Sequence, residues 1–261
     1  MKITTWNVNS LTARLQHVLD WLQANPVDVL CLQELKLTED KFPLMELAAA
    51  GYAHCAVFGQ KTYNGVALLS RQPLREVGRN IEGFQDESSR VIAATLDTPA
   101  GPLRLVNGYF VNGQAPGTEK FAYKMAWLDG LNRYLAAQLR EHPRLVLVGD
   151  FNIAPEDRDS YDPEGLRETI HHSTPEREHF RRLLELGLVD GFRLFEQPEK
   201  SYTWWDYRML GYQKNRGLRI DHVLVSQALR SAVQACSIDR TPRKWKQPSD
   251  HAPVTVDLAL G

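Results

Sequence analysis

Short apolar runs follow one another between residues 53 and 110 with no helical pattern between them. "GVALLS" at 65–70, "RVIAATL" at 90–96 and "LRLVNGYF" at 103–110 have the length and the flanking turn residues of strands. A doubly wound parallel sheet or a regular barrel would place a helix between such strands. The pattern therefore favours an α/β fold in which two mixed sheets pack together and helices lie outside them.

The rest of the chain shows strand and helix patterns as well. Further strands are predicted at 2–6, 28–32, 144–150, 220–226 and 253–260. Helices are predicted over 13–24 and 119–141, and "STPERE" predicts the start of a third helix with Pro175 in its first turn. The chain has no linker or short-period repeat, so we expect a single domain over residues 1–261.

Cysteine usage and hydropathy indicate where the protein works. Three cysteines lie far apart, form no CxxC pair and leave one thiol unpaired under any disulfide scheme, which fits a reducing compartment. The N-terminus turns polar after a few residues, and no stretch is apolar for long enough to cross a bilayer. We therefore expect a cytoplasmic protein with no membrane partner.

Positive charge is concentrated in one part of a chain whose net charge is only −1. Between Lys200 and Asp250 there are ten Lys and Arg residues against four Asp and Glu residues, interleaved with tryptophans and tyrosines. Basic residues mixed with aromatics suit a nucleic acid, whose phosphates pair with the charges and whose bases or sugars stack on the rings. Charge counting alone slightly favours the alternative, a solvated surface above core aromatics.

Polar side chains collect at the ends of the predicted strands. Such residues are found along the whole sequence: Asn7, Glu34, Tyr109, Asp150, Asp221, and the "PSDHAP" segment that contains Asp250 and His251. In layered folds the strand ends are where a rigid scaffold presents reacting side chains. A carboxylate after a strand is often merely solvated, which is the alternative for Glu34.

The segment "GDFN" at 149–152 begins within the last two residues of the predicted strand at 144–150. If the backbone stays extended, Asp150 and Asn152 face the same side while Phe151 points into the core. A carboxylate and a carboxamide then share one small space. An isolated segment of this kind fits a turn equally well, with Asp and Asn capping backbone N–H groups.

Carboxylate and amide oxygens of this kind are hard ligands, and no cysteine is placed to assist them. Mg²⁺ or Mn²⁺ is therefore more plausible than structural Zn²⁺, and Mg²⁺ usually keeps substrate phosphate among its ligands. We expect Asp221 to orient His251, while Asp250 faces the metal or the backbone. A single histidine is more often structural, so this expectation depends on the whole set of residues.

Taken together, the ordered segments "TWNVNS", "LQELK", "NGYF", "GDFNI", "WWDYR", "NRGLRID" and "SDHAP" resemble the exonuclease III family of DNA-repair phosphodiesterases. That family includes the bacterial apurinic/apyrimidinic endonucleases. The resemblance spans the chain from Asn7 to Pro253, with compatible order and spacing. It implies a four-layer α/β sandwich of two mixed β-sheets flanked by helices, the DNase I-like fold.

The resemblance also implies a set of roles for the strand-end residues. Glu34 would be the principal Mg²⁺ ligand, with Asn7 and Asp250 nearby. A second metal position, or direct action on the substrate, would involve Asp150, Asn152 and His251. In hydrolysis of the phosphodiester, Asp150 would move a proton, Asp221 would orient His251, and Tyr109 would contact the phosphate or assist the proton transfer.

The implied partner is double-stranded DNA with abasic sites or blocked 3′ ends, bound by a monomer. Arg90 matches a phosphate-contacting arginine of the family, and Trp204 an aromatic beside the pocket for the abasic sugar. Met209 and Leu210 form a loop that would wedge into the duplex. A surface loop with incidental hydrophobic residues is an equal alternative for this pair.

One segment departs from the family pattern. "ETIHHSTPE" carries His171 and His172 where many relatives carry small or neutral polar residues. We hypothesise that one of these histidines crowds the phosphate beyond the scissile bond and lowers internal incision relative to 3′-end trimming or 3′-phosphate removal.

Two other functions compete with the nuclease. The first is a phosphatase of the same superfamily acting on inositol phosphates or phospholipid head groups, against which "WWDYR" and "NRGLRID" argue. The second is a DNA-binding module without catalysis. Binding alone would not require so many mutually repelling acids, so the sequence favours the enzyme.

Overall fold

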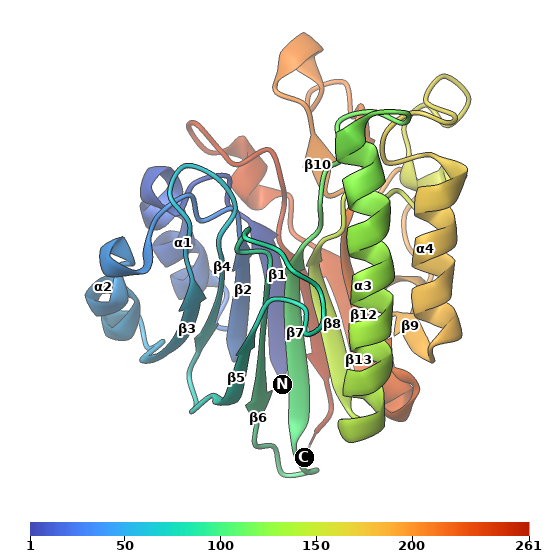
Figure 1. The fold of residues 1–261 in the computed structure, drawn as a ribbon. Helices are drawn as coiled ribbons and strands as arrows, with labels where there is room; N and C mark the ends of the chain where they lie inside the picture. The colour runs from blue at the N-terminus through green and yellow to red at the C-terminus, as the bar shows by residue number, and fades with distance from the viewer. Residues whose placement is uncertain (261) are drawn as a thin grey trace.

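The computed structural model of the chain describes residues 1–260. Two six-stranded mixed sheets lie face to face, and helices cover their outer faces (Figure 1). The first sheet has the order β13-β14-β1-β2-β4-β3. Its strands, in chain order, are β1 (Lys2–Asn7), β2 (Val29–Gln33), β3 (His54–Phe58), β4 (Val66–Ser70), β13 (Val233–Ile238) and β14 (Val254–Leu258). The expected α/β sandwich is therefore confirmed.

The second sheet has the order β5-β6-β7-β8-β12-β9. Its strands are β5 (Arg75–Arg79), β6 (Val91–Leu96), β7 (Leu103–Tyr109), β8 (Leu145–Asp150), β9 (Leu188–Asp190) and β12 (Asp221–Ser226). A separate two-stranded ribbon consists of β10 (Trp204–Trp205) and β11 (Gly217–Leu218). The ribbon supports the loop that projects at the top of Figure 1, whereas both termini lie at the lower end.

Four α-helices form the outer layers. They are α1 (Leu11–Ala24), α2 (Leu44–Ala49), α3 (Glu119–Glu141) and α4 (Thr174–Glu185). The predicted start of the third helix is confirmed, since Ser173 caps α4 and makes a capping box with Glu176. The apolar faces of α3 and α4 pack on the second sheet, and α1 packs on the first.

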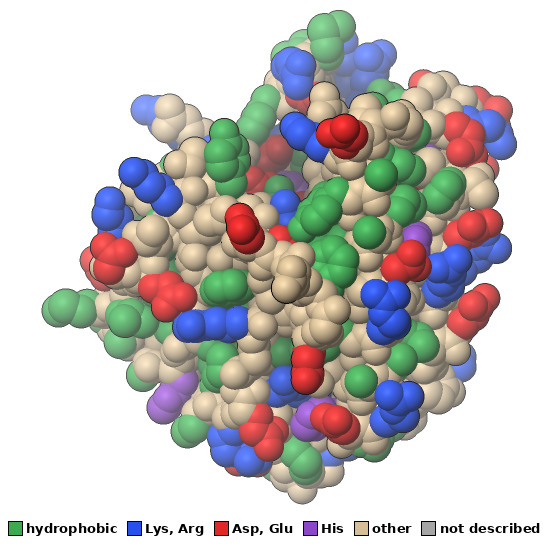
Figure 2. Space-filling model, in the orientation of Figure 1, with side chains coloured by type: hydrophobic (Ala, Val, Ile, Leu, Met, Phe, Trp, Pro, Cys, Tyr) green, Lys and Arg blue, Asp and Glu red, His purple; other side chains and the backbone are tan. Residues whose placement is uncertain are grey.

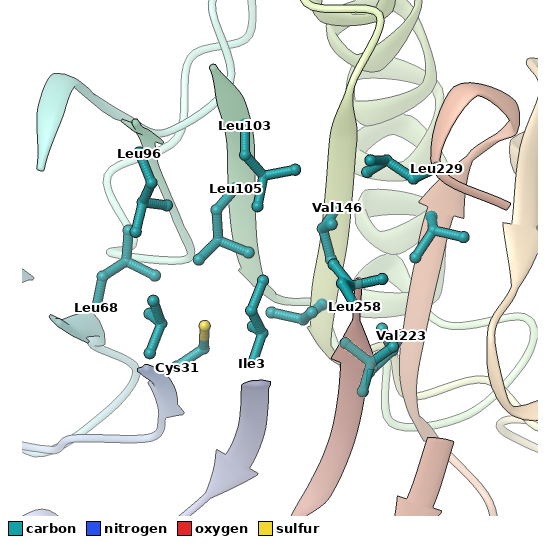
Figure 3. Close-up of a cluster of buried hydrophobic side chains, with 14 of the residues drawn as sticks. Ile3, Cys31, Leu68, Leu96, Leu103, Leu105, Val146, Val223, Leu229 and Leu258 are labelled. Carbon is teal, nitrogen blue, oxygen red and sulfur yellow. The ribbon is translucent and has the colours of Figure 1, made fainter. Parts of the chain in front are cut away.

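The main core lies between the two sheets. Side chains from both sheets meet there in Figure 3, where Ile3, Cys31 and Leu68 of the first sheet face Leu105, Val146 and Val223 of the second. Because a helix layer covers the other face of each sheet, most inner strands are buried on both sides; β14, whose residues alternate between buried and half-buried, is the exception. This double burial explains their nearly continuous apolar sequences.

The structure contains strands that the sequence patterns did not predict. Besides the short β10–β11 ribbon, the unpredicted strands are the four edge strands of the two sheets, β3, β5, β9 and β13. The clearest case is β5, "REVGR", whose residues are mostly exposed. An edge strand with one solvated face lacks the continuous apolar run by which an inner strand is recognised.

Candidate active site at the strand ends

Strand pairing brings the predicted polar residues to one end of the sandwich. In the second sheet, Tyr109 of β7 and Asp221 of β12 are both paired with Asp150 of β8, so the three residues form one row. In the first sheet, β1 ends at Asn7 beside Gln33, and Glu34 follows at once. Figure 2 shows this face hollowed below the projecting loop, with acidic, basic and histidine side chains inside the hollow.

Three of these side chains converge closely enough to hold a metal ion. Glu34, Asp150 and His251 each offer a ligand atom, and these atoms lie within 4.8 Å of one another. Asp150 and His251 are buried, and Glu34 is half-buried. We call these three residues the carboxylate–histidine group. Two hard oxygen donors beside an imidazole fit a divalent cation such as Mg²⁺ or Mn²⁺.

Asn7 connects the acids of the two sheets. Its Nδ2 donates to Glu34 Oε1 at 2.8 Å and to Asp150 Oδ2 at 2.9 Å, while its Oδ1 accepts the N–H of Asn9 at 3.0 Å. In this placement the carboxamide presents its N–H groups to the carboxylates. Lys36 adds a positive charge, with its Nζ 2.9 Å from Glu34 Oε2. Both contacts offset the repulsion between the clustered acids.

His251 makes the expected contact with Asp221. Its Nδ1 lies 2.9 Å from Asp221 Oδ2, and its Nε2 lies 3.7 Å from Asp150 Oδ2. Burial opposes a charge on His251, but Asp221 and Asp150 outweigh burial and raise the pKa of the imidazole. Burial, followed by Asp221 and Glu34, also raises the pKa of Asp150, whereas His251 opposes that shift. Asp150 and His251 therefore form a coupled pair that can hold and pass a proton.

The turn after β8 differs from the expected extended geometry. The strand ends at Asp150, and Asn152 has a left-handed backbone with φ 51°. Phe151 does point into the core, where it stacks on Phe110 with the ring centroids 4.1 Å apart. Asn tolerates this conformation better than most residues. The extended alternative was therefore wrong at Asn152, and the turn alternative, in which Asp150 caps a backbone N–H, is the one observed.

The backbone N–H and the side chain of Asn152 make three hydrogen bonds that hold the residue in this left-handed turn. Its backbone N–H donates to Asp150 Oδ1 at 3.0 Å. Its side-chain Nδ2 donates to the carbonyl of Phe110 at 3.0 Å, and its Oδ1 accepts from Asn112 Nδ2 at 3.3 Å. Asn152 thus orients the Asp150 carboxylate and links the turns that follow β7 and β8.

Tyr109 and Arg90 lie together on one side of the row. The Arg90 guanidinium lies over the Tyr109 ring, 5.3 Å from its centroid, and its Nε is 3.8 Å from Asp86 Oδ2. Burial, followed by the charges of Glu34 and Asp150, raises the pKa of Tyr109 well above its usual value. The phenol therefore remains protonated at neutral pH and serves as a hydrogen-bond donor.

Asp250 lies beside the carboxylate–histidine group and is not one of its three members. Its Oδ1 accepts from Asn9 Nδ2 at 3.0 Å, and its Oδ2 accepts from Trp204 Nε1 at 2.9 Å. Trp204 also forms a β-bridge with His251. Asp250 thus ties β10 to the site, so its contacts are with side chains rather than with the backbone that was the expected alternative.

The loop with Met209 and Leu210 is strongly exposed. These side chains are 75% and 58% exposed, and both residues have φ 56°. Beside the loop lies a pocket of about 310 Å³, whose lining includes Trp204, Met209 and His171. An apolar, projecting loop next to a pocket can contact a large ligand.

His171 and His172 are buried on the other side of this pocket. His171 Nδ1 lies 2.7 Å from the carbonyl oxygen of Asn152, and His172 Nε2 lies 2.9 Å from Ser160 Oγ. Burial, reinforced by the nearby Lys124 charge, lowers the pKa of His171 to about 3. His171 is therefore neutral at physiological pH, and it contacts the turn that holds Asn152.

Several residues at the site had not been singled out from the sequence. Asn9 and Lys36 lie inside the quoted segments "TWNVNS" and "LQELK", so the motifs pointed to their neighbourhood. Asn112 and Lys124 had no such signal, because they reach Asn152 only through the folded chain.

No helix in residues 1–260 has the length and apolar character needed to span a membrane.

The chain is similar to known nucleases and phosphatases over nearly its whole length. The model of the Endonuclease/Exonuclease/phosphatase family matches residues 4–251. Exodeoxyribonuclease III of Haemophilus influenzae is 35% identical over 270 residues, covering 99% of this chain and all of the relative. The 3′ phosphatase NExo from Neisseria, solved with a product DNA hairpin, is 47% identical with a TM-score of 0.95 and 99% of each chain covered. An AP endonuclease from Archaeoglobus fulgidus is 34% identical with a TM-score of 0.93 and the same coverage of both chains.

Proposed function

The chain belongs to the Endonuclease/Exonuclease/phosphatase family, and on this premise we propose that it is a DNA-repair phosphodiesterase of the exonuclease III type. Its substrate is double-stranded DNA, which it hydrolyses at abasic sites or at 3′ ends that need trimming or unblocking. The observation that carries the proposal is the convergence of Glu34, Asp150 and His251 within 4.8 Å at the strand ends. The relatives named above give the substrate class.

The proposed cofactor is Mg²⁺, with Mn²⁺ as a substitute. Glu34 would be its principal ligand, with the Asn7 carboxamide turned to offer its oxygen, which leaves Asp150 for proton transfer. The bound cation supplies positive charge that offsets the negative charge developing on the phosphate oxygens. Asn152, His251 and Asp250 are further candidates for contact with a metal, as the resemblance implied.

The protein's own groups divide the remaining work of hydrolysis. Asp150 takes a proton from the attacking water, a role that suits a carboxylate whose pKa is raised by burial and neighbouring acids. His251, held by Asp221, donates a hydrogen bond to a phosphate oxygen. The Tyr109 hydroxyl and the second N–H of the Asn152 carboxamide donate to the phosphate as well.

The proposed DNA contacts surround this centre. Arg90 pairs with a backbone phosphate, and Trp204 packs against the sugar that enters the pocket beside it. Met209 and Leu210 insert between base pairs, since apolar side chains on an exposed loop can unstack a base step at a cost of about a few kcal/mol. This arrangement favours the nuclease over a phosphatase for small soluble substrates.

Metal removal provides the direct test of the proposal. Duplexes with an internal abasic analogue or a 3′-phosphate are expected to be cleaved in Mg²⁺, to be left intact in EDTA, and to be cleaved again when Mg²⁺ or Mn²⁺ is added in excess. Gel electrophoresis of labelled strands measures the result. Cleavage that persists in EDTA would contradict the metal-dependent mechanism.

The same assay separates the competing functions. Release of phosphate from inositol phosphates, with no cut in either DNA, would favour the phosphatase. Retarded migration of DNA on a native gel without cleavage in any divalent cation would favour the binding module.

We further propose that His171 determines the balance between the DNA reactions. It lines the pocket beside Trp204 and contacts the carbonyl of Asn152. His171→Gly is expected to raise the ratio of internal incision to 3′-phosphate removal by roughly tenfold, which corresponds to about 1.4 kcal/mol of transition-state stabilisation. His172→Gly is the comparison variant, because His172 lines the same pocket but bonds to Ser160 rather than to Asn152, so a change confined to His171→Gly would assign the role to the Asn152 contact. If the ratio of internal incision to 3′-phosphate removal is the same in wild type and both variants, His171 does not determine the balance between the two reactions.

A further inference from the structure

Lys124 is a fully buried lysine that contacts both turns of the proposed site. Its Nζ donates to the carbonyl of Asn112 at 3.1 Å and to the carbonyl of Asn152 at 2.8 Å, and it forms an ion pair with Glu176 Oε1. Its side chain and that of Glu176 are both 0% exposed. All three N–H donors of the ammonium group are therefore used inside the protein.

The two carbonyls belong to the segments that follow β7 and β8. Asn112 lies just beyond Tyr109, and Asn152 lies just beyond Asp150. The carbonyl of Asn152 also accepts from His171 Nδ1 at 2.7 Å, so two donors hold this peptide group in its left-handed conformation. The N–H of the same residue bonds to Asp150. A shift of the turn would therefore move the carboxylate.

Glu176 completes the connection from the helix side. Its Oε1 accepts the N–H of His171 at 3.0 Å, and its Oε2 accepts the N–H and the hydroxyl of Ser173 at 3.1 and 2.6 Å. The space around Lys124 is closely filled, because a Cβ on Gly113 would lie 2.8 Å from Lys124 Cδ. The Lys124 side chain therefore has little free space on the side of Gly113.

We infer that Lys124 is a positioning residue for the hydrolytic reaction, with Glu176 holding its ammonium in place. Together they fix the turns after β7 and β8 so that Asn152 keeps Asp150 in the reactive orientation. This inference rests on the proposed function, since it concerns the same site. The competing explanation is that the ion pair only joins α3 to α4.

A neutral double variant separates these two roles. Replacing both members of a buried ion pair with uncharged residues is often neutral for stability. In Lys124→Met with Glu176→Gln no buried charge is left unpaired, but the carbonyls of Asn112 and Asn152 lose their ammonium donor, so the Tm is expected to fall by several degrees. Its kcat is expected to fall roughly 10- to 100-fold, the loss that a displacement of about 1 Å causes, while KM is unchanged.

Leu128→Ala is the matched control on the same helix. Leu128 is a buried residue of α3 and belongs to the apolar cluster between the helix layer and the second sheet, so its truncation is expected to lower the Tm while kcat is retained. The backbone amide resonance of Asn152 gives a second measurement in the absence of DNA. It is expected to shift in the neutral double variant and to stay in place in Leu128→Ala.

Different results would contradict the positioning role of Lys124 and the proposed function. Wild-type kcat and an unshifted Asn152 resonance in the neutral double variant would overturn the positioning role. If that variant does not fold, Lys124→Gln with Glu176→Gln keeps a hydrogen bond between the helices and must still lower kcat, since the two N–H donors of an amide cannot serve both carbonyls and the side chain at position 176. A wild-type protein that cleaves no DNA would instead reject the proposed function itself.

Discussion

Asp150→Asn is expected to lower kcat by roughly 10²- to 10⁴-fold, because the amide cannot accept the proton that the carboxylate takes from the attacking water. The side chain sits where both carboxylate oxygens are used: Oδ2 accepts from Asn7 and Oδ1 from the backbone of Asn152. An Asn side chain retains only one of these acceptors. Rapid-quench measurement of cleavage in Mg²⁺ gives the kcat.

The same substitution is expected to leave the fold at least as stable as wild type. The folded-state pKa of Asp150 is raised by burial and by Asp221 and Glu34. A carboxyl group with a raised folded-state pKa opposes folding when it is ionised, and this penalty grows as the pH rises through the unfolded-state value. The Tm of Asp150→Asn in EDTA at pH 7 should therefore equal or exceed that of wild type.

Asp190→Asn is the matched control for this result. Asp190 is buried and pairs with Arg219 at 2.8 Å, away from the carboxylate–histidine group. Losing this charge leaves the buried Arg219 with one carboxylate partner fewer, so the Tm should fall while kcat is retained. The two Asp→Asn variants thus have opposite expected effects. A fully active Asp150→Asn protein would reject Asp150 as the proton acceptor.

The second large effect is expected at His251. His251→Ala should lower kcat by roughly 10²- to 10³-fold, because the phosphate loses a buried, positively charged hydrogen-bond donor at the point where its negative charge grows. Asp221→Asn should lower kcat less, since the imidazole remains in place without the carboxylate that orients it. Measured rates of the two single variants give the order of these losses.

A double-variant cycle tests whether Asp221 acts through His251. Once the imidazole is absent, Asp221 has nothing to orient, so Asp221→Asn with His251→Ala should be no slower than His251→Ala alone. The contact between His251 Nδ1 and Asp221 is the structural basis for this coupling. Losses that add in the double variant would show that the two residues act separately.

Individual residues show why much of the site was predictable from the sequence. Asn7, Glu34, Tyr109, Asp150 and Asp221 lie at or beside the ends of strands that the apolar runs mark out, so strand prediction also placed the residues. The order of the motifs along the chain does not depend on the length or conformation of the loops that join them. The set therefore predicted one acidic centre before any contact was known.

Other parts of the site depend on contacts between distant segments. The donation from Asn7 to Asp150 joins residues 143 positions apart, and the Lys124–Glu176 pair joins residues 52 positions apart. Neither pair has a periodic or local signal. The left-handed backbone of Asn152 was missed for a similar reason, since Lys124 and His171 hold its carbonyl from other elements.

The sequence by itself determined the eight inner strands, the ends of those strands and the residue types found there. It did so because burial on both faces requires a continuous apolar run, and the run stops where the chain meets solvent. Only the tertiary structure decided where the edge strands lie, since an edge strand pairs with a neighbour on one side alone. It also decided the directions in which the site's side chains point. Those directions follow from hydrogen bonds across the two sheets, which form only when the sheets and helices have packed together.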